Sequence, residues 1–200
     1  MNGCRIRPYA RLEGTYRLAH ADLSGANLYR ARLARANLEE TNFSNANLFE
    51  VDLFRANLKH ANLSGADLKN VNLTKACLVG ANLSGANLTS SLLIETDLTN
   101  ANLEGANLSH VRCSSAVFMG ARVVGASLHR AHGSQASFNG ANLEGADLSE
   151  GVFVGVDFTE SLLTGTRFQG ADLRQSILPD THRGLASSQS IEPVPMELEE

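Results

Sequence analysis

The chain has 200 residues, of which 43% are hydrophobic and 19% are charged, and its 17 basic and 21 acidic side chains give a formal net charge of −4. This composition excludes a wholly disordered chain, and the near balance of charge favours neither a generally basic nucleic-acid binder nor a strongly acidic protein. No apolar run exceeds four residues, so we expect no transmembrane segment and a cytoplasmic protein, with secretion by a route that lacks a cleavable signal left open.

Residues 1–15 precede any regular pattern and hold three large apolar side chains, Ile6, Tyr9 and Leu12. We interpret this segment as an amino-terminal cap, because the ends of a repeat structure expose backbone edges that need cover. The expected cap ends where a five-residue repeat begins.

Residues 16–180 repeat with a period of five. From Leu18 to Leu178 there are 33 positions spaced five apart, and all carry a large apolar side chain except Cys113 and Gly133. The residue two places before each of them is alanine at 21 of the 33 positions, and the residue between is Asn or Asp at 19. The unit is therefore Ala-(Asn/Asp)-Leu-x-x, with Gly, Ser, Asn and Thr frequent at the last two places.

A period of five fits neither a straight α-helix nor a flat strand. On a helix each step of five turns the side chain by about 140°, which scatters the leucines over every face. On a strand an odd step places successive leucines on opposite sides of the sheet. The pattern instead predicts a chain that is extended for about three residues and turns at the last two, so that the leucines fill the axis of a solenoid.

This motif, uninterrupted over residues 16–180, is identified as that of the pentapeptide-repeat family. The resemblance implies an all-β fold, a right-handed quadrilateral β-helix with four units per coil and about eight coils. It also implies the leading function that we expect, a non-catalytic rigid scaffold or protein–protein interaction module. The alternative comes from the quinolone-resistance members of the family, which imitate DNA and occupy the DNA-binding site of the topoisomerase gyrase. Residues 1–80 carry 11 basic and 7 acidic side chains, a balance that opposes such mimicry.

Four units per coil would place residues twenty apart above one another. Opposite charges would then stack in three columns, which are His20–Glu40–His60, Glu39–Lys59, and a third that holds Arg30–Glu50 and, further along, Arg130–Glu150. We interpret these columns as solvated ion pairs between coils and not as a metal site.

One column would carry like charges, because Arg35, Arg55 and Lys75 share a single corner, and outward aromatic residues lie nearby. The candidate partner-binding patch consists of Tyr29, Arg30, Arg32, Arg35, Phe49, Phe54, Arg55 and Lys75. Such a patch predicts docking of an acidic protein of unknown identity, with nucleic acid or an anionic lipid surface as less favoured partners. The simpler interpretation is that these side chains only keep the rod soluble.

Between His110 and Asn139 the middle position of the unit loses its Asn or Asp, and Gly133 leaves an inward position without a side chain. We therefore expect a bulge or a weaker coil in this stretch. The stretch also contains His129 and His132, but the spacing of its histidines identifies neither a partner acid nor a nucleophile. Cys113 falls on an inward position and is interpreted as a core filler.

The sequence contains no GxSxG elbow, no phosphate-cradling GxxxxGK[ST] loop and no HExxH motif. The three cysteines, Cys4, Cys77 and Cys113, are widely spaced and predict neither a disulfide frame nor a zinc site. We therefore predict that the protein is not an enzyme and uses no cofactor or metal.

The repeat stops after Pro179. Residues 181–200 contain two prolines and four glutamates and show no apolar helical periodicity, so we expect a largely disordered acidic tail. The expected organisation is a cap at 1–15, a β-helix at 16–180 and a tail at 181–200.

Overall fold

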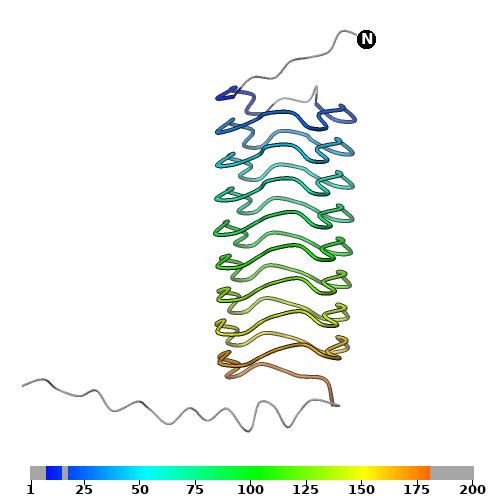
Figure 1. Ribbon diagram of the computed structural model, residues 1–200, viewed down its shortest axis with the longest axis vertical. Helices are drawn as coiled ribbons and strands as arrows, with labels where there is room; N and C mark the ends of the chain where they lie inside the picture. Colours follow the sequence, from blue (N-terminus) through cyan, green and yellow to red (C-terminus); the bar gives the residue numbers. More distant parts are fainter. Residues whose placement is uncertain (1–7, 15–17, 181–200) are drawn as a thin grey trace, which may run out of the picture.

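The computed structural model of the protein describes residues 8–14 and 18–180. In these residues the chain winds around a straight axis, and each coil lies on the previous one to form a rod (Figure 1). The parallel backbone pairs from Asp22–Asn42 to Asp157–Ile177 all join a residue to the one that lies four repeat units further along the chain. A coil therefore has four units, and the chain from Leu18 to Leu178 makes eight coils. The fold is the right-handed quadrilateral β-helix that the sequence predicts.

Each coil has four faces, which we number by their central residues. In the first coil the central residue is Leu18 on face 1, Leu23 on face 2, Leu28 on face 3 and Leu33 on face 4. Each face recurs every twenty residues, once per coil. In residues 8–14 and 18–180 there is no helix or strand of several residues: single parallel bridges alternate with two-residue turns, and Asp180 alone has a 3₁₀ conformation. No helix within these ranges is long and apolar enough to cross a bilayer.

The two-residue turns bend the chain because the second turn residue adopts a left-handed backbone conformation. Every residue at this place, from His20 to Gln175, has φ between 54° and 70°. Most of them are not glycine, although other residues adopt such φ values rarely. Each non-glycine residue at this place costs roughly 1 kcal/mol of backbone strain, which the hydrogen bonds between coils and the buried core offset.

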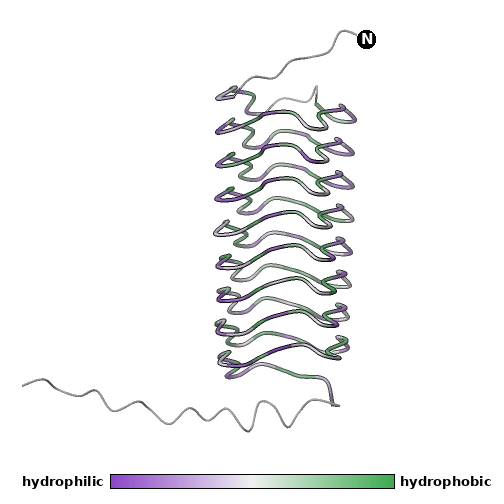
Figure 2. Cartoon of the chain, viewed as in Figure 1, coloured by the Kyte–Doolittle hydropathy of each residue, from purple (hydrophilic) through white to green (hydrophobic). Residues whose placement is uncertain are grey.

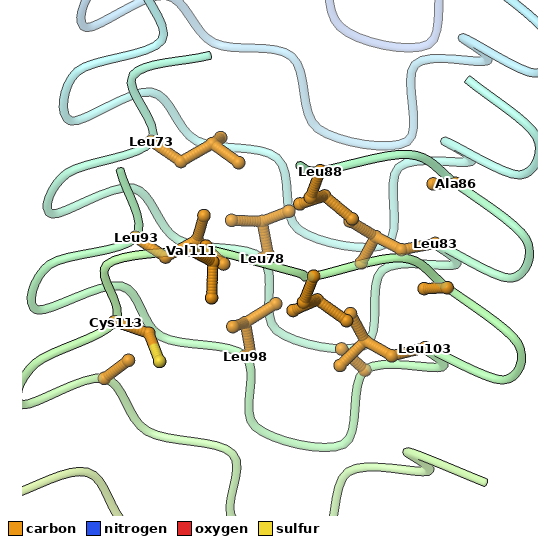
Figure 3. Close-up of a cluster of buried hydrophobic side chains, with 14 of the residues drawn as sticks. Leu73, Leu78, Leu83, Ala86, Leu88, Leu93, Leu98, Leu103, Val111 and Cys113 are labelled. Carbon is orange, nitrogen blue, oxygen red and sulfur yellow. The ribbon is translucent and has the colours of Figure 1, made fainter. Parts of the chain in front are cut away.

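The central residues of the units fill the axis of the rod. Figure 3 shows Leu78 and Leu98, one coil apart on face 1, pointing into the interior with Leu83 of face 2. All three are fully buried, as is the small residue Ala101 two places before a central leucine. Burial of each leucine contributes about 1.5–3 kcal/mol, and Figure 2 shows that apolar segments recur in every coil. The spacing of the leucines therefore determines the winding of the chain.

Cys113 is one of these central residues, on face 4. It is fully buried, and burial raises the pKa of its thiol to about 12. The thiol is therefore neutral at physiological pH and acts as a small apolar side chain, as the sequence predicts.

The coils continue without a bulge through residues 110–139, so the prediction of a bulge there is wrong, whereas the alternative of a weaker coil stays a prediction. Arg112 and His132 keep the regular pairing between coils, and the backbone N–H of Gly133 keeps its inter-coil hydrogen bond at 2.8 Å. The space that Gly133 leaves is filled by the Phe153 ring, because a Cβ built on Gly133 would lie 2.9 Å from Cδ1 and Cε1 of Phe153. A large side chain from the next coil thus replaces the missing one.

The Asn or Asp of the unit supports both the turn and the stacking. On face 2 the Asn62 Oδ1 accepts a hydrogen bond from the Ser64 N–H at 3.2 Å. Its Nδ2 donates to Asn42 Oδ1 at 3.1 Å, and Asn82 Nδ2 donates to Asn62 Oδ1 at 3.3 Å. The side chain therefore satisfies a turn N–H and joins successive coils.

The first described segment, residues 8–14, pairs with the first coil. The Leu12 N–H donates to the Arg32 carbonyl at 2.8 Å. Its register is shifted by one position from that of the coils, because Arg11 pairs with Arg32, whereas the regular register would pair it with Ala31. The remainder of the expected cap and the expected tail at 181–200 lie outside the described residues.

Candidate protein-binding surface

An aromatic ladder runs along the turn from face 3 to face 4 at the start of the rod. It consists of Tyr9, Tyr29 and Phe49. The Tyr9 and Tyr29 rings meet edge to face with centroids 5.5 Å apart, and Tyr29 stacks on Phe49 at 5.7 Å with an interplanar angle of 23°. Tyr9 is 61% exposed, whereas the other two are half-buried. Tyr29 and Phe49 thus stack on successive coils, as their spacing in the sequence predicts.

Cations lie beside both stacked rings. The Arg30 guanidinium carbon is 5.1 Å from the Tyr29 ring centre, and Lys69 Nζ is 5.8 Å from that of Phe49. Arg30 also forms an ion pair with Glu50, whose hydrogen bond and charge raise the pKa of Arg30. Lys69 is not included in the patch predicted from the sequence. Its position twenty residues after Phe49, and therefore one coil later, is the signal that could have found it.

The turn from face 4 to face 1 carries a basic corner, with the exposed side chains of Arg35, Arg55 and Lys75 on three successive coils. Lys75 forms an ion pair with Glu95 at 3.2 Å. In contrast, no carboxylate of the described residues forms an ion pair with Arg35 or Arg55. The Arg55 guanidinium carbon lies 5.2 Å from the centre of the Phe54 ring. Two guanidinium groups on adjacent coils therefore have no anionic partner in this part of the chain.

The predicted patch is thus split over two neighbouring turns. Arg32 lies between them on face 4, with Nη1 3.9 Å from Glu13 Oε1. We call the combined set the basic-aromatic surface; it consists of Tyr29, Arg30, Arg32, Arg35, Phe49, Phe54, Arg55 and Lys75, to which the structure adds Tyr9 and Lys69.

Ion pairs between coils form in two of the three predicted columns, as His20–Glu40 in one and as Arg30–Glu50 and Arg130–Glu150 in another. The predicted Glu39–Lys59 pair is wrong, because no ion pair joins these two described residues. Glu39 instead accepts a 3.4 Å hydrogen bond from Asn57 Nδ2. Residues 8–14 and 18–180 hold no group of three His, Cys, Asp or Glu side chains that could bind a metal ion.

The histidines of the 110–139 stretch are divided between faces. The rings of His110 and His129 lie edge to face, 6.2 Å apart, and His129 Nδ1 is 2.9 Å from Ser149 Oγ. His132 belongs to face 4 and pairs through its backbone. Sequence reasoning missed that His129 and Ser149 line a hollow on face 3 that is open to solvent.

A family model described as pentapeptide repeats matches the chain in eight copies, over residues 17–53, 52–89, 86–123, 96–132, 112–149 and 141–179. The chain belongs to the pentapeptide repeat family. Members of this family are generally non-catalytic. None of the curated proteins matches the chain in sequence.

Solved structures of other pentapeptide repeat proteins are similar to this chain. Trypsin-treated QnrB1, a plasmid-mediated fluoroquinolone resistance protein, is 20% identical over 93% of this chain and 97% of that chain, with a TM-score of 0.66. HetL, involved in heterocyst differentiation regulation in the cyanobacterium Nostoc sp. strain PCC 7120, is 32% identical over 89% and 93%, with a TM-score of 0.31. A pentapeptide repeat protein of the Arabidopsis thaliana thylakoid lumen is 30% identical over 54% and 68%, with a TM-score of 0.41. The likeness to QnrB1 shows the common fold.

Proposed function

We propose that this protein is a non-catalytic interaction module that binds an acidic segment of a partner protein on its basic-aromatic surface. The observation that supports this most is the pair Arg35 and Arg55. They lie on adjacent coils, with paired chains about 4.8 Å apart, and both are exposed without a carboxylate partner in the described residues. Like charges at this spacing repel, so an anionic segment that contacts both relieves the repulsion.

Other cations of the rod show how such charges are usually accommodated. Arg30, Lys75 and Arg130 each meet a glutamate of the next coil. Lys59 and Arg112 also lack a carboxylate partner in the described residues, but neither has an Arg or Lys above or below it in its column. These two isolated cations fit simple solvation, whereas the stacked arginines favour a partner.

The aromatic ladder favours a protein over a nucleic acid as that partner. Bases bind to protein aromatic rings by stacking on an open ring face. Tyr29 and Phe49 stack on each other, and Arg30 and Lys69 lie over their rings. The ring edges remain as apolar contact area, of the kind that protein interfaces use.

The rest of the rod also suits binding more than catalysis. Its coils are held by backbone hydrogen bonds along their whole length, as in Leu63 N–H to the Asn82 carbonyl at 2.6 Å. A partner that docks on such a rigid surface therefore orders little additional chain, which lowers the entropic cost of binding.

A DNA-mimicking protein that binds gyrase is the alternative, and it requires negative charge along most of the rod. Residues 81–200 carry 6 basic and 14 acidic side chains, but residues 1–80 carry 11 basic and 7 acidic ones. The first part of the chain therefore has the wrong sign for a mimic of DNA. QnrB1 shares the fold at 20% identity, which supports no transfer of its resistance function.

The test compares partner capture by the wild-type chain and by Arg35→Glu/Arg55→Glu. The matched control is Lys59→Glu/Arg112→Glu, which changes the net charge equally at exposed sites away from the basic corner. We expect the partner to bind the wild type and the control and to bind the Arg35/Arg55 variant at least about tenfold more weakly, because charge-assisted hydrogen bonds are lost. Equal binding by the two double variants overturns the proposal.

A further inference from the structure

A polar hollow on face 3 is lined by residues between positions 109 and 169, in the carboxy-terminal half of the rod. These positions belong to the green to orange coils of Figure 1. Its volume is about 510 Å³, and it is open to solvent. The lining residues are Ser109, Ser127, His129, Asp147, Ser149, Arg167 and Gln169. Three of these are serines, and Ser127 stands where the previous coil has Asn107. Short side chains at places that otherwise carry longer ones create the space.

The acceptor atoms of Asp147 are occupied within the protein. Its Oδ2 accepts from Arg167 Nη2 at 2.6 Å, and its Oδ1 accepts from the Ser149 backbone N–H at 3.0 Å. Burial raises the pKa of Asp147, but hydrogen bonds from the Ser149 side chain and backbone and from Arg167 outweigh it, so the net pKa is lowered. Asp147 therefore stays ionised and holds its neighbours in place.

His129 lies beside this network. Its Nδ1 is 2.9 Å from the Ser149 hydroxyl oxygen, and either atom can be the donor, according to the tautomer of the ring. His129 Nε2 has no hydrogen-bond partner among the described residues, and in the imidazolium form it is a donor.

The polar groups of the hollow that still have hydrogen-bonding capacity for a ligand are mainly donors. The Arg167 side chain is 68% exposed, and its Nε and Nη1 atoms donate no hydrogen bond within the described residues. The side-chain amide of Gln169, which also lines the hollow, donates none there either. The hydroxyls of Ser109 and Ser127 share one hydrogen bond of 2.8 Å, which leaves one of their two hydrogens over. A cation would be repelled by Arg167, so the hollow fits an acceptor-rich anion.

We propose that the face 3 hollow is a binding site for the phosphate group of a phosphorylated ligand. A tetrahedral phosphate presents three terminal oxygens, and Arg167, protonated His129 and Gln169 supply donors to them from three side chains. The charges of Arg167, Asp147 and protonated His129 sum to +1. Binding of the anion is therefore coupled to protonation of His129, and the coupling is reciprocal.

The titratable and charged groups around His129 are His110, the Asp147–Arg167 pair and the Arg130–Glu150 pair. Each ion pair is neutral as a whole. Histidine is the residue type that gains a proton in the mildly acidic range, so an anion affinity that rises on acidification is the expected signature of contact with the histidines of the hollow.

The first experiment measures anion binding to the full chain by calorimetry and by the NMR signals of the histidine rings. Sulfate is the probe for pH dependence, because its own charge is constant in this range. We expect sulfate to bind at least about fivefold more tightly at pH 6 than at pH 8 and to shift the NMR signals of the His129 ring. We expect acetate to bind at least about tenfold more weakly than inorganic phosphate. A sulfate affinity that is independent of pH, or equal binding of acetate and phosphate, overturns the proposal.

The second experiment uses three variants and inorganic phosphate. Arg167→Gln should weaken binding at least about tenfold. Ser127→Asn restores the usual residue and fills the hollow, so it should abolish binding while the melting temperature is retained. Arg122→Gln removes a comparable arginine, paired with Glu104 at 2.9 Å on face 2, and should leave binding unchanged. Wild-type affinity in either of the first two variants overturns the proposal.

The source of the phosphate is distinguished by comparing inorganic phosphate with a phosphoserine peptide. Tighter binding of the peptide identifies a phosphorylated protein as the ligand. Equal binding shows that the hollow contacts the phosphate group alone. The basic-aromatic surface shares no residue with the hollow, so Arg35→Glu/Arg55→Glu should bind phosphate like the wild type. The two proposals therefore fail or succeed separately.

Discussion

Gly133 and Phe153 form a complementary pair in the core, and exchange of Gly133 for alanine should destabilise the rod. The added Cβ would lie 2.9 Å from two ring carbons of Phe153 and 3.2 Å from Cys113 Sγ. Contacts this close force a shift, and Phe153 is fully buried and has little room to move. Overpacking of this kind costs about 1–3 kcal/mol, which in a chain of this length lowers the melting temperature by roughly 3–9 °C.

The double variant Gly133→Ala/Phe153→Leu tests this reasoning. Leucine is the usual central residue, and it removes the ring atoms that the new methyl group would contact. Phe153→Leu alone leaves a cavity and should also destabilise, by about 1–2 kcal/mol. We expect the double variant to be more stable than the sum of the two single effects by at least about 1 kcal/mol in thermal and urea unfolding. A Gly133→Ala protein as stable as the wild type, or strictly additive effects, refutes the packing argument.

Three further outcomes are expected. Asn62→Ala should lower the free energy of unfolding by about 1–2 kcal/mol because it loses a turn bond and two inter-coil bonds, and Asn62→Asp, which keeps both accepting bonds, should lose less in the same urea titration. Hydrogen bonds from the Arg174 side chain hold the pKa of Asp172 below its usual value, so its stabilisation is present at neutral pH and lost as the pH falls below about 4; Asp172→Asn should therefore lose less stability than the wild type between pH 7 and pH 3. In a gyrase supercoiling assay, with and without a quinolone, the purified protein should neither inhibit nor protect the enzyme, and protection would instead support the DNA-mimic alternative.

The fold was accessible from the sequence because a single spacing determines it. Leucines at every fifth position cannot share one side of a helix or strand, and the structure buries them on the axis of a rod with four repeat units per coil. The columns follow from that number, so Arg30 and Glu50 could be paired from the sequence alone. Spacing gives only the register, however, and the Glu39–Lys59 pair fails because Glu39 bonds to Asn57 instead.

The candidate sites were less accessible because side-chain size and direction decide them. Gly133 predicts a bulge when it is considered alone, whereas the structure compensates with Phe153, one coil later. Lys75 also has its partner one coil later, because it pairs with Glu95. The sequence interpretation considered only the like charges of Arg35, Arg55 and Lys75 and did not follow the column to that residue. The hollow was missed for the same reason: its serines are ordinary repeat residues in sequence, and only their grouping on one face creates space. Writing the sequence in rows of twenty residues, one coil per row, would reveal the Gly133–Phe153 pair, the Lys75–Glu95 pair and the hollow.

Modification of arginine side chains with phenylglyoxal, read out by mass spectrometry with and without the bound partner, tests the docking surface most directly. Arg35 and Arg55 are exposed in the free chain and should lose reactivity in the complex, whereas Arg112, also exposed but remote from the basic corner, should keep it. Unchanged reactivity of Arg35 and Arg55 in a saturated complex would contradict the assignment of the basic-aromatic surface as the partner-binding site.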